Sequence, residues 1–344
     1  MLHIDGSDGE GGGQVLRTAL GLSLATGTPF RIEGIRGRRK NPGLRRQHLC
    51  CVQAAVEVGS AVATGAAMGS TALEFHPGPL RSGDFAFAIG SAGSTGLVLQ
   101  TVLPGLLRAA GPSTVRLSGG THNPMAPPFD FLEKAFAPVL HGMGIGLDLQ
   151  LVRHGFWPAG GGVLAAAIAP CPAPTPFELV LRTDAGPWRA RALLSQIREE
   201  VGVREVMALR QGTGRELLRR EQVHIEEVAA DGPGNALLLE VPMVGLCEVF
   251  TAFGERGVSA EQVAAALASA VMPFWRSGAP VGPHLADQLL IPMALAGGGA
   301  FRTVEPTLHC RTNAALIERF LPVRFAMAPD GGDDRAWTVR CEPA

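Results

Sequence analysis

The chain has 344 residues, of which 46% are hydrophobic and 18% are charged, and its formal net charge is −1. This composition predicts a globular protein with a large core; it excludes a disordered chain, and the near-zero charge argues against a basic coat for long duplexes. No apolar run reaches the length of a membrane span, and the N-terminus lacks a secretory pattern. The six cysteines show neither a CxxC pair nor zinc spacing, so we expect reduced thiols in a cytoplasmic protein with no membrane partner.

The first feature along the chain is the glycine-rich loop GSDGEGGGQVLR at residues 6–17, which precedes an apolar run. It contains no lysine and is not a Walker A loop, and its spacing does not fit a dinucleotide fold. Its glycines expose backbone N–H groups at a helix start, where the helix dipole favours anions. Glu10 would repel a phosphate there unless a divalent cation lay between them, while Gln14 and Arg17 can face the same anion from the first helical turn. The loop therefore predicts an anion site with a metal-binding acid, the alternative being a structural turn.

A basic segment follows at residues 36–48, RGRRKNPGLRRQH, and it contains no acidic residue. Its charged and titratable members are Arg36, Arg38, Arg39, Lys40, Arg45, Arg46 and His48. A local basic patch on a nearly neutral protein indicates a site that binds phosphate groups. A solvated basic loop is the alternative.

Three segments of the chain resemble one another, at residues 11–35, 93–120 and 285–306. Each passes from a turn of small residues into an apolar helix of about three turns and then into a strand. A second helix is expected after each, at residues 47–59, 128–144 and 312–321. The pattern predicts an α/β (α+β) fold with three repeated strand–helix–strand–helix–strand units, whose helices cover one face of each sheet.

Residues 180–275 differ in composition from the rest of the chain, because they are richer in charged residues. They follow a segment rich in glycine and proline. We expect a smaller α/β domain inserted between the second and third units. The predicted large domain then comprises residues 1–179 and 276–344.

Three polar residues fall on the apolar helices of the second and third units. Gln100 occupies a position that faces inward, where it either contacts a ligand or is a satisfied core amide. Asp287 and Gln288 lie at the start of the third apolar helix, and Asp287 is either a helix cap or an acid that binds a ligand.

His309 is expected at the end of a strand, before the Thr-Asn pair of residues 312–313, which is typical of a helix N-cap. Strand ends before helix starts are where α/β proteins place reactive groups, although a structural histidine is the alternative. The chain has only two lysines, Lys40 and Lys134, and neither has the K-x-D-G setting of a lysine that carries a nucleotide. If a covalent nucleotide forms, a histidine is the better nucleophile.

Six blocks of the sequence, in order over residues 1 to about 325, resemble the RNA 3′-terminal phosphate cyclase family. They are DGSDGEGGGQVLRTALGLSLATG, GRRKNPGLRRQHL, FAIGSAGSTGLVLQTVLP, HGFWPAGGGV, HLADQLLIPMALA and CRTNAALIERFLPVRF. The resemblance implies an enzyme that uses ATP, with Mg²⁺ or Mn²⁺, to convert an RNA 3′-terminal phosphate to a 2′,3′-cyclic phosphodiester. It implies a covalent histidine–AMP intermediate, transfer of AMP to the RNA 3′-phosphate, and attack by the neighbouring 2′-hydroxyl. It also implies three α/β repeats with a small inserted domain.

The resemblance also assigns roles by position. His309 matches the nucleophile and Glu10 the metal-binding acid. The residues that match contacts to the phosphate or RNA end are Gln14, Arg17, Arg36, Arg39 and His48. Those that match ATP contacts are Gln100, Pro127, His284, Leu285, Ala286, Asp287 and Gln288. His284 departs from the tyrosine of the familiar bacterial enzyme, and an imidazole stacks on a purine with less area.

Two other classes remain as alternatives. A non-catalytic, cyclase-like RNA-binding protein of ribosome assembly would lack the nucleophilic histidine, which this chain retains. An enolpyruvyl transferase shares the repeated unit but would need lysines for its anionic substrates. The expected partners are therefore RNA 3′-phosphate ends and ATP, with no obligate protein partner evident and a homodimer left open.

Overall fold

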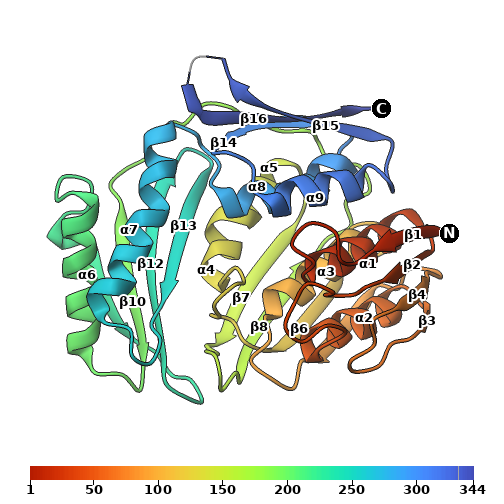
Figure 1. Cartoon of the computed structure of the whole chain (residues 1–344), viewed down its shortest axis with the longest axis horizontal. Coiled ribbons are helices and arrows are strands. Elements are labelled where there is room, and N and C mark those ends of the chain that lie inside the picture. The colour runs from red at the N-terminus through yellow and green to blue at the C-terminus, as the bar shows by residue number, and fades with distance from the viewer. Residues whose placement is uncertain (332) are drawn as a thin grey trace.

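The computed structural model describes residues 1–331 and 333–344 and contains four sheets, each of four strands (Figure 1). Helices pack on these sheets and against one another, so the predicted mixed α/β class is confirmed. Within the described residues, no helix is both long enough and apolar enough to cross a membrane. All six cysteines are free thiols.

Three of the sheets share one order of strands, in which the first strand pairs in parallel with the second, and the fourth lies between the second and the third. The elements of the first unit are β1 (Leu2–Asp5), α1 (Gln14–Thr26), β2 (Phe30–Glu33), α2 (Arg46–Val58), β3 (Val62–Thr64) and β4 (Leu73–His76). Those of the second are β5 (Gly83–Ala88), α3 (Thr95–Leu106), β6 (Ser113–Gly119), α4 (Phe129–Phe131), η1 (Leu132–Phe136), α5 (Ala137–Gly142), β7 (Leu147–Arg153) and β8 (Gly162–Ile168). Those of the third are β9 (Glu178–Leu179), α8 (Pro283–Leu295), β14 (Gly299–Thr303), α9 (Leu308–Ile317), β15 (Val323–Asp330) and β16 (Asp333–Pro343).

Each of these units has one strand more than the predicted pattern, because its last two strands form an antiparallel pair. The helix expected at 128–144 begins at Phe129 and is divided into α4, η1 and α5, with a π-helical turn in the middle.

The fourth sheet has the order β11-β10-β12-β13 and belongs to the charged part of the chain. Its elements are β10 (Arg189–Ser195), α6 (Glu199–Thr213), η2 (Arg220–Gln222), β11 (Val223–Glu227), β12 (Gly234–Met243), β13 (Leu246–Phe253) and α7 (Ala260–Ser277). We call these elements the inserted sheet and its helices; α6 and α7 lie side by side on one face of it (Figure 1). Because β9 pairs with β14, the inserted sheet lies within the third unit and not between the second and third units. The domain division at residues 180 and 275 stays a prediction.

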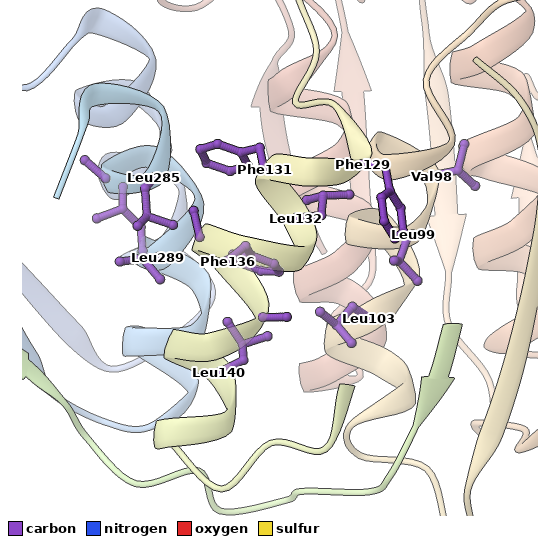
Figure 2. Close-up of a cluster of buried hydrophobic side chains, with 14 of the residues drawn as sticks. Val98, Leu99, Leu103, Phe129, Phe131, Leu132, Phe136, Leu140, Leu285 and Leu289 are labelled. Atoms are coloured by element: carbon purple, nitrogen blue, oxygen red, sulfur yellow. The ribbon is translucent and has the colours of Figure 1, made fainter. Parts of the chain in front are cut away.

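The middle of the molecule is built from helices, because α1 packs on α3 and α9, and α9 packs on α8 (Figure 1). Leucine and phenylalanine side chains of α3, η1, α5 and α8 fill the space between these helices (Figure 2). Leu285 and Leu289, for example, are completely buried. Burial of this kind contributes about 1.5–3 kcal/mol per large side chain, so these contacts fix the helices that carry the polar residues described next.

Candidate active site

A cavity of about 830 Å³ lies between the helices of the three units and the inserted sheet. One wall comes from α1, α3, α8 and α9, and the other from β13 and α7. The predicted site residues that line the cavity are Gln14, Arg17, Gln100, Pro127, His284, Asp287, Gln288 and His309. Segments far apart in the sequence therefore meet at one cavity, whose size is in the range of small-molecule sites.

His309 lies in the first turn of α9 and not at a strand end, which corrects the sequence-based prediction. The helix begins earlier than expected, because the hydroxyl group of Thr307 caps it by accepting a hydrogen bond from the backbone N–H of Cys310. Asn313, expected near a cap, lies inside α9 one turn after His309. Its side chain binds Asp287 and accepts a hydrogen bond of 2.7 Å from Thr18.

A chain of hydrogen bonds orients the His309 imidazole. The Gln14 amide donates through Nε2 to both carboxylate oxygens of Asp287, at 2.6 and 2.8 Å. Because carboxylate oxygens accept, the Gln14 amide turns its Oε1 toward Nδ1 of His309, and the two atoms form a hydrogen bond. Nδ1 therefore holds a proton, and Nε2 is the atom of the ring left for chemistry.

Asp287 is not a helix cap, because α8 begins at Gly282 and Pro283 and the carboxyl group lies in the second turn. Burial raises the pKa of Asp287, against the opposing effects of His309 and the Gln14 hydrogen bond. The N–H donors of Gln14 and Asn313 satisfy the carboxyl oxygens. Asp287 thus fixes the polar network that surrounds His309.

Glu10 faces His309 from the glycine-rich loop. Its Oε2 lies 2.9 Å from Nε2 of His309 and 3.4 Å from a guanidinium nitrogen of Arg39. Arg38 joins the same loop to the basic segment by donating to the backbone oxygen of Gly9, at 2.8 Å. The two motifs that looked separate in the sequence therefore form one surface next to His309.

Arg17 and His48 meet over Gly13, the N-cap of α1, which has no side-chain capping bond. Burial, together with the neighbouring charges of Arg17, Arg36 and Arg45, lowers the pKa of His48 to about 3. The imidazole is therefore neutral, and the positive charge of this group resides on the arginines. A helix N-terminus flanked by arginines is a favourable place for an anion.

Arg36 lies in the same basic loop, with a left-handed backbone conformation at φ 55°. Its guanidinium group donates to the backbone oxygens of Asn41 and Gly43, at 2.6 and 3.1 Å. Arg36 thus stabilises the loop as well as adding charge.

Two of the predicted ATP contacts do not line the cavity. The side chains of Leu285 and Ala286 are 0% and 2% exposed and lie in the core (Figure 2 labels Leu285). Their neighbours His284, Asp287 and Gln288 line the cavity, because the helical period turns successive side chains to different sides. The side chain of Gln288 is held by a hydrogen bond from Gln100 of α3.

The family model of RNA 3′-terminal phosphate cyclase matches residues 8–327 of the chain. A curated protein of Ralstonia nicotianae named RNA 3′-terminal phosphate cyclase is 51% identical over 335 residues, which cover 95% of this chain and 93% of that protein. This chain belongs to the RNA 3′-terminal phosphate cyclase family. Among solved structures, the enolpyruvyl transferase NikO from Streptomyces tendae is 20% identical, with a TM-score of 0.28 over 48% of this chain and 33% of its own.

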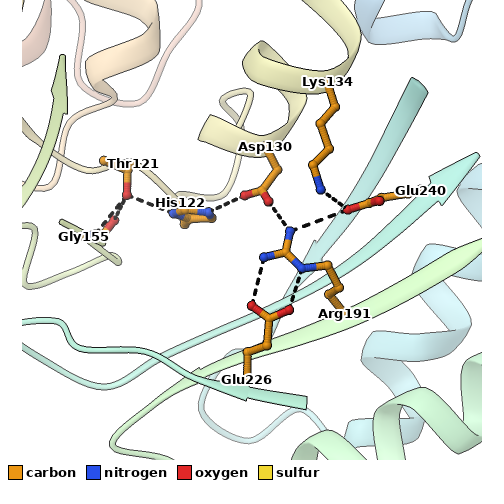
Figure 3. A network of polar contacts seen from close by, with 8 residues as sticks. All are labelled: Thr121, His122, Asp130, Lys134, Gly155, Arg191, Glu226 and Glu240. Atoms are coloured by element: carbon orange, nitrogen blue, oxygen red, sulfur yellow. Dashed lines mark hydrogen bonds and ion pairs between the residues drawn. The ribbon is translucent and has the colours of Figure 1, made fainter. Parts of the chain in front are cut away.

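In this member of the cyclase family, a buried polar network joins the second unit to the inserted sheet, and sequence reasoning missed it (Figure 3). Asp130 accepts from His122 at 2.8 Å and pairs with Arg191 of β10. Arg191 also binds Glu226 of β11 through two hydrogen bonds, of 2.7 and 2.9 Å. Beside it, Lys134 pairs with Glu240 of β12.

No sequence spacing reveals this network, because its members come from separate segments that meet only in the folded chain. Asn313 could have been found from its spacing, because it follows His309 by four residues and residues four apart lie on the same face of a helix.

Proposed function

We propose that the chain is an ATP-dependent RNA 3′-terminal phosphate cyclase that works through a covalent His309–AMP intermediate. The observation that carries the proposal is the hydrogen-bond chain from Asp287 through Gln14 to Nδ1 of His309. It directs Nε2 of the imidazole toward the surface where Glu10 and Arg39 meet. A purely structural histidine would not need this orientation. The hydrogen bonds to His309 therefore favour an enzyme over a non-catalytic RNA-binding protein.

In the first step, Nε2 of His309 forms a bond to the α-phosphorus of ATP while the bond to the bridging oxygen breaks, and pyrophosphate leaves. An oxygen of the RNA 3′-phosphate then displaces His309 from that phosphorus and forms an RNA adenylate. Finally, the 2′-hydroxyl oxygen attacks the 3′-phosphorus and loses its proton, and AMP leaves. Phosphoryl chemistry of this kind depends mainly on position and on neutralised charge.

The residues of the cavity divide these tasks. Gln14 and Asp287 hold the proton on Nδ1. Pro127 and His284 offer surfaces on which a purine can lie, and the Gln100–Gln288 pair offers polar atoms to the nucleotide. Arg17, Arg36, Arg39 and the neutral His48 would receive the 3′-phosphate of the RNA beside the N-terminus of α1.

Glu10 fits a magnesium or manganese ion held by one protein carboxylate and by substrate phosphates. Among the described residues, no group of three or more acids, histidines and cysteines is arranged to hold a metal ion. Such an ion would neutralise phosphate charge. In the structure Oε2 of Glu10 lies 2.9 Å from Nε2 of His309, so a cation held by Glu10 would lie beside the imidazole.

The test is to incubate the protein with Mg²⁺ and ATP labelled on the α-phosphate. The wild type should gain an acid-labile label and lose it to RNA that ends in a 3′-phosphate, with release of AMP and a cyclic end. His309→Ala should remain unlabelled. The matched control is His76→Ala, which removes an exposed histidine of β4 that contacts Glu74, and it should label normally.

Label that persists in His309→Ala would rule out this nucleophile, and an unlabelled wild type would favour the RNA-binding alternative. A substrate with a 2′-deoxy end cannot cyclise, because it lacks the attacking hydroxyl.

A further inference from the structure

Glu248 is a buried acid of the inserted sheet whose side chain reaches the beginning of α8. It lies on β13 with 2% of its surface exposed, and its Oε1 accepts a hydrogen bond of 2.5 Å from the backbone N–H of Gly282. A Cβ atom at Gly282 would lie only 3.0–3.1 Å from the carboxyl carbon and both oxygens of Glu248. The glycine therefore permits the close approach of the carboxyl group.

A carboxyl group in this position is costly to bury. No ion pair to Glu248 is present in the described part of the chain, and burial raises its pKa to about 8, although the N–H groups of Gly282 and Val249 oppose this shift. An apolar side chain of similar size would usually cost less in such a core. The position of this acid is therefore better explained by what it holds in place than by fold stability.

The element that it holds is the nucleotide wall of the cavity. Gly282 is the N-cap of α8 and has no side chain to cap the helix, and Pro283 follows it. The next two turns present His284, Asp287 and Gln288 to the cavity. A shift of the beginning of α8 would move all three of these side chains together.

The strand that carries Glu248 also forms the opposite wall. Successive residues of a strand point to opposite faces, and Val249 and Thr251 of β13 line the cavity while Glu248 turns away from it toward α8. One strand therefore contacts both walls, and the Glu248–Gly282 hydrogen bond is one link between them, close to the segment of residues 278–282 that joins α7 to α8.

We propose that Glu248 is a positioning residue of the nucleotide site, where it holds the beginning of α8 against β13 and so sets the separation of the two walls. This inference rests on the proposed function, because it assumes that ATP occupies the cavity. Glu248 acts through α8 and touches neither substrate nor reacting atoms.

The experiment compares the rate of His309 labelling against ATP concentration in Glu248→Leu, Glu248→Gln and the wild type. Leucine fills the space but cannot accept from Gly282, so the KM for ATP should rise about tenfold, the equivalent of about one hydrogen bond, while kcat changes less than about threefold. Glutamine keeps an oxygen acceptor and should restore a KM within about twofold of the wild type.

The matched control is Glu205→Leu. Glu205 is another completely buried acid beside the inserted sheet, on α6, and it binds Asn235 rather than α8. Its replacement tests whether loss of a buried carboxyl group alone changes the KM, and we expect no change. Thermal unfolding of each variant would give the folded fraction, by which the rates are corrected.

An unchanged KM in Glu248→Leu would overturn the positioning role, as would an equal increase in Glu205→Leu or a failure of glutamine to restore the KM. In each of these cases the labelled wild type would leave the proposed function intact. A wild type that gains no label would overturn the proposed function and the positioning role together.

Discussion

A methyl group added at Gly13 should slow RNA cyclisation much more than it slows the labelling of His309 by ATP. An ideal Cβ atom there would lie 2.1 Å from Nε2 of His48, 2.6 Å from its Cδ2 and 2.9 Å from Nη1 of Arg17. The backbone at Gly13 has φ −83° and ψ −6°, a negative φ that does not require glycine. The main effect expected of Gly13→Ala therefore comes from the displaced side chains.

The size of the displacement follows from these contacts. The His48 ring has to move by about 1.3 Å to reach an ordinary contact of 3.4 Å, and it has little room because only 9% of His48 is exposed. Overpacking of this kind costs about 1–3 kcal/mol of stability. A displacement of about 1 Å in a binding group can reduce turnover about 100-fold.

We expect Gly13→Ala to lower the rate of RNA cyclisation about 100-fold while the rate of His309 labelling by ATP falls less than about tenfold. The physical reason is that Arg17 and His48 are proposed to receive the RNA phosphate, whereas Gln14 and Asp287 orient His309. Single-turnover assays with labelled ATP and with RNA 3′-phosphate measure the two rates separately.

The control is Gly142→Ala at the exposed end of α5, where a Cβ atom would meet nothing within 4 Å. This variant should match the wild type in both assays. If Gly13→Ala cyclised RNA at the normal rate, or if both rates fell equally, the assignment of Arg17 and His48 to the RNA phosphate would be refuted.

Three further predictions concern stability and nucleotide binding. Arg191→Ala should reduce the free energy of unfolding by about 3–5 kcal/mol in denaturant titrations, because it leaves Asp130 buried without its cation. The control Arg204→Ala breaks an exposed ion pair and should cost less than about 1 kcal/mol. Equal losses in the two variants would contradict the argument. Burial raises the pKa of Glu248 from 4.5 to about 8, so the stability that its protonated form contributes is complete below pH 4.5 and is lost as the pH rises through 8. In Glu248→Gln the free energy of unfolding should no longer fall by a few kcal/mol over this pH range. An unchanged pH dependence of stability would refute the shift. His284→Ala should raise the KM for ATP by about two- to tenfold with little change in kcat, as expected for loss of a stacked ring, and an unchanged KM would exclude stacking at this position.

The helices that carry the site could be predicted from the sequence where an apolar periodic segment has glycines at both of its ends. Helix α1 begins at Gln14 after three glycines, and Gly27 ends it in a left-handed conformation, as the pattern indicates. The beginning of α9 was predicted incorrectly, because both Thr307 and Thr312 are suitable caps and only the folded chain shows which one binds the helix.

Glu10, the arginines and His309 were found from chemistry that is visible locally, whereas Pro127, His284, Leu285 and Ala286 came only from the resemblance to the family. Their relationship was not visible. Whether Gln14 would bind a phosphate or orient His309 depends on Asp287, which lies in a distant segment of the chain. The core positions of Leu285 and Ala286 depend in the same way on which side of α8 packs against the other helices.

The sequence by itself therefore determined the class of fold, the α1 helix and the residue types available for phosphate chemistry, since propensity, periodicity and charge act over a few neighbouring residues. The tertiary structure alone decided the orientation of the His309 imidazole, the link from Glu248 to α8 and the network around Arg191. Each of these depends on a hydrogen bond or ion pair between segments far apart in the chain, and such contacts exist only after the apolar core has brought the segments together.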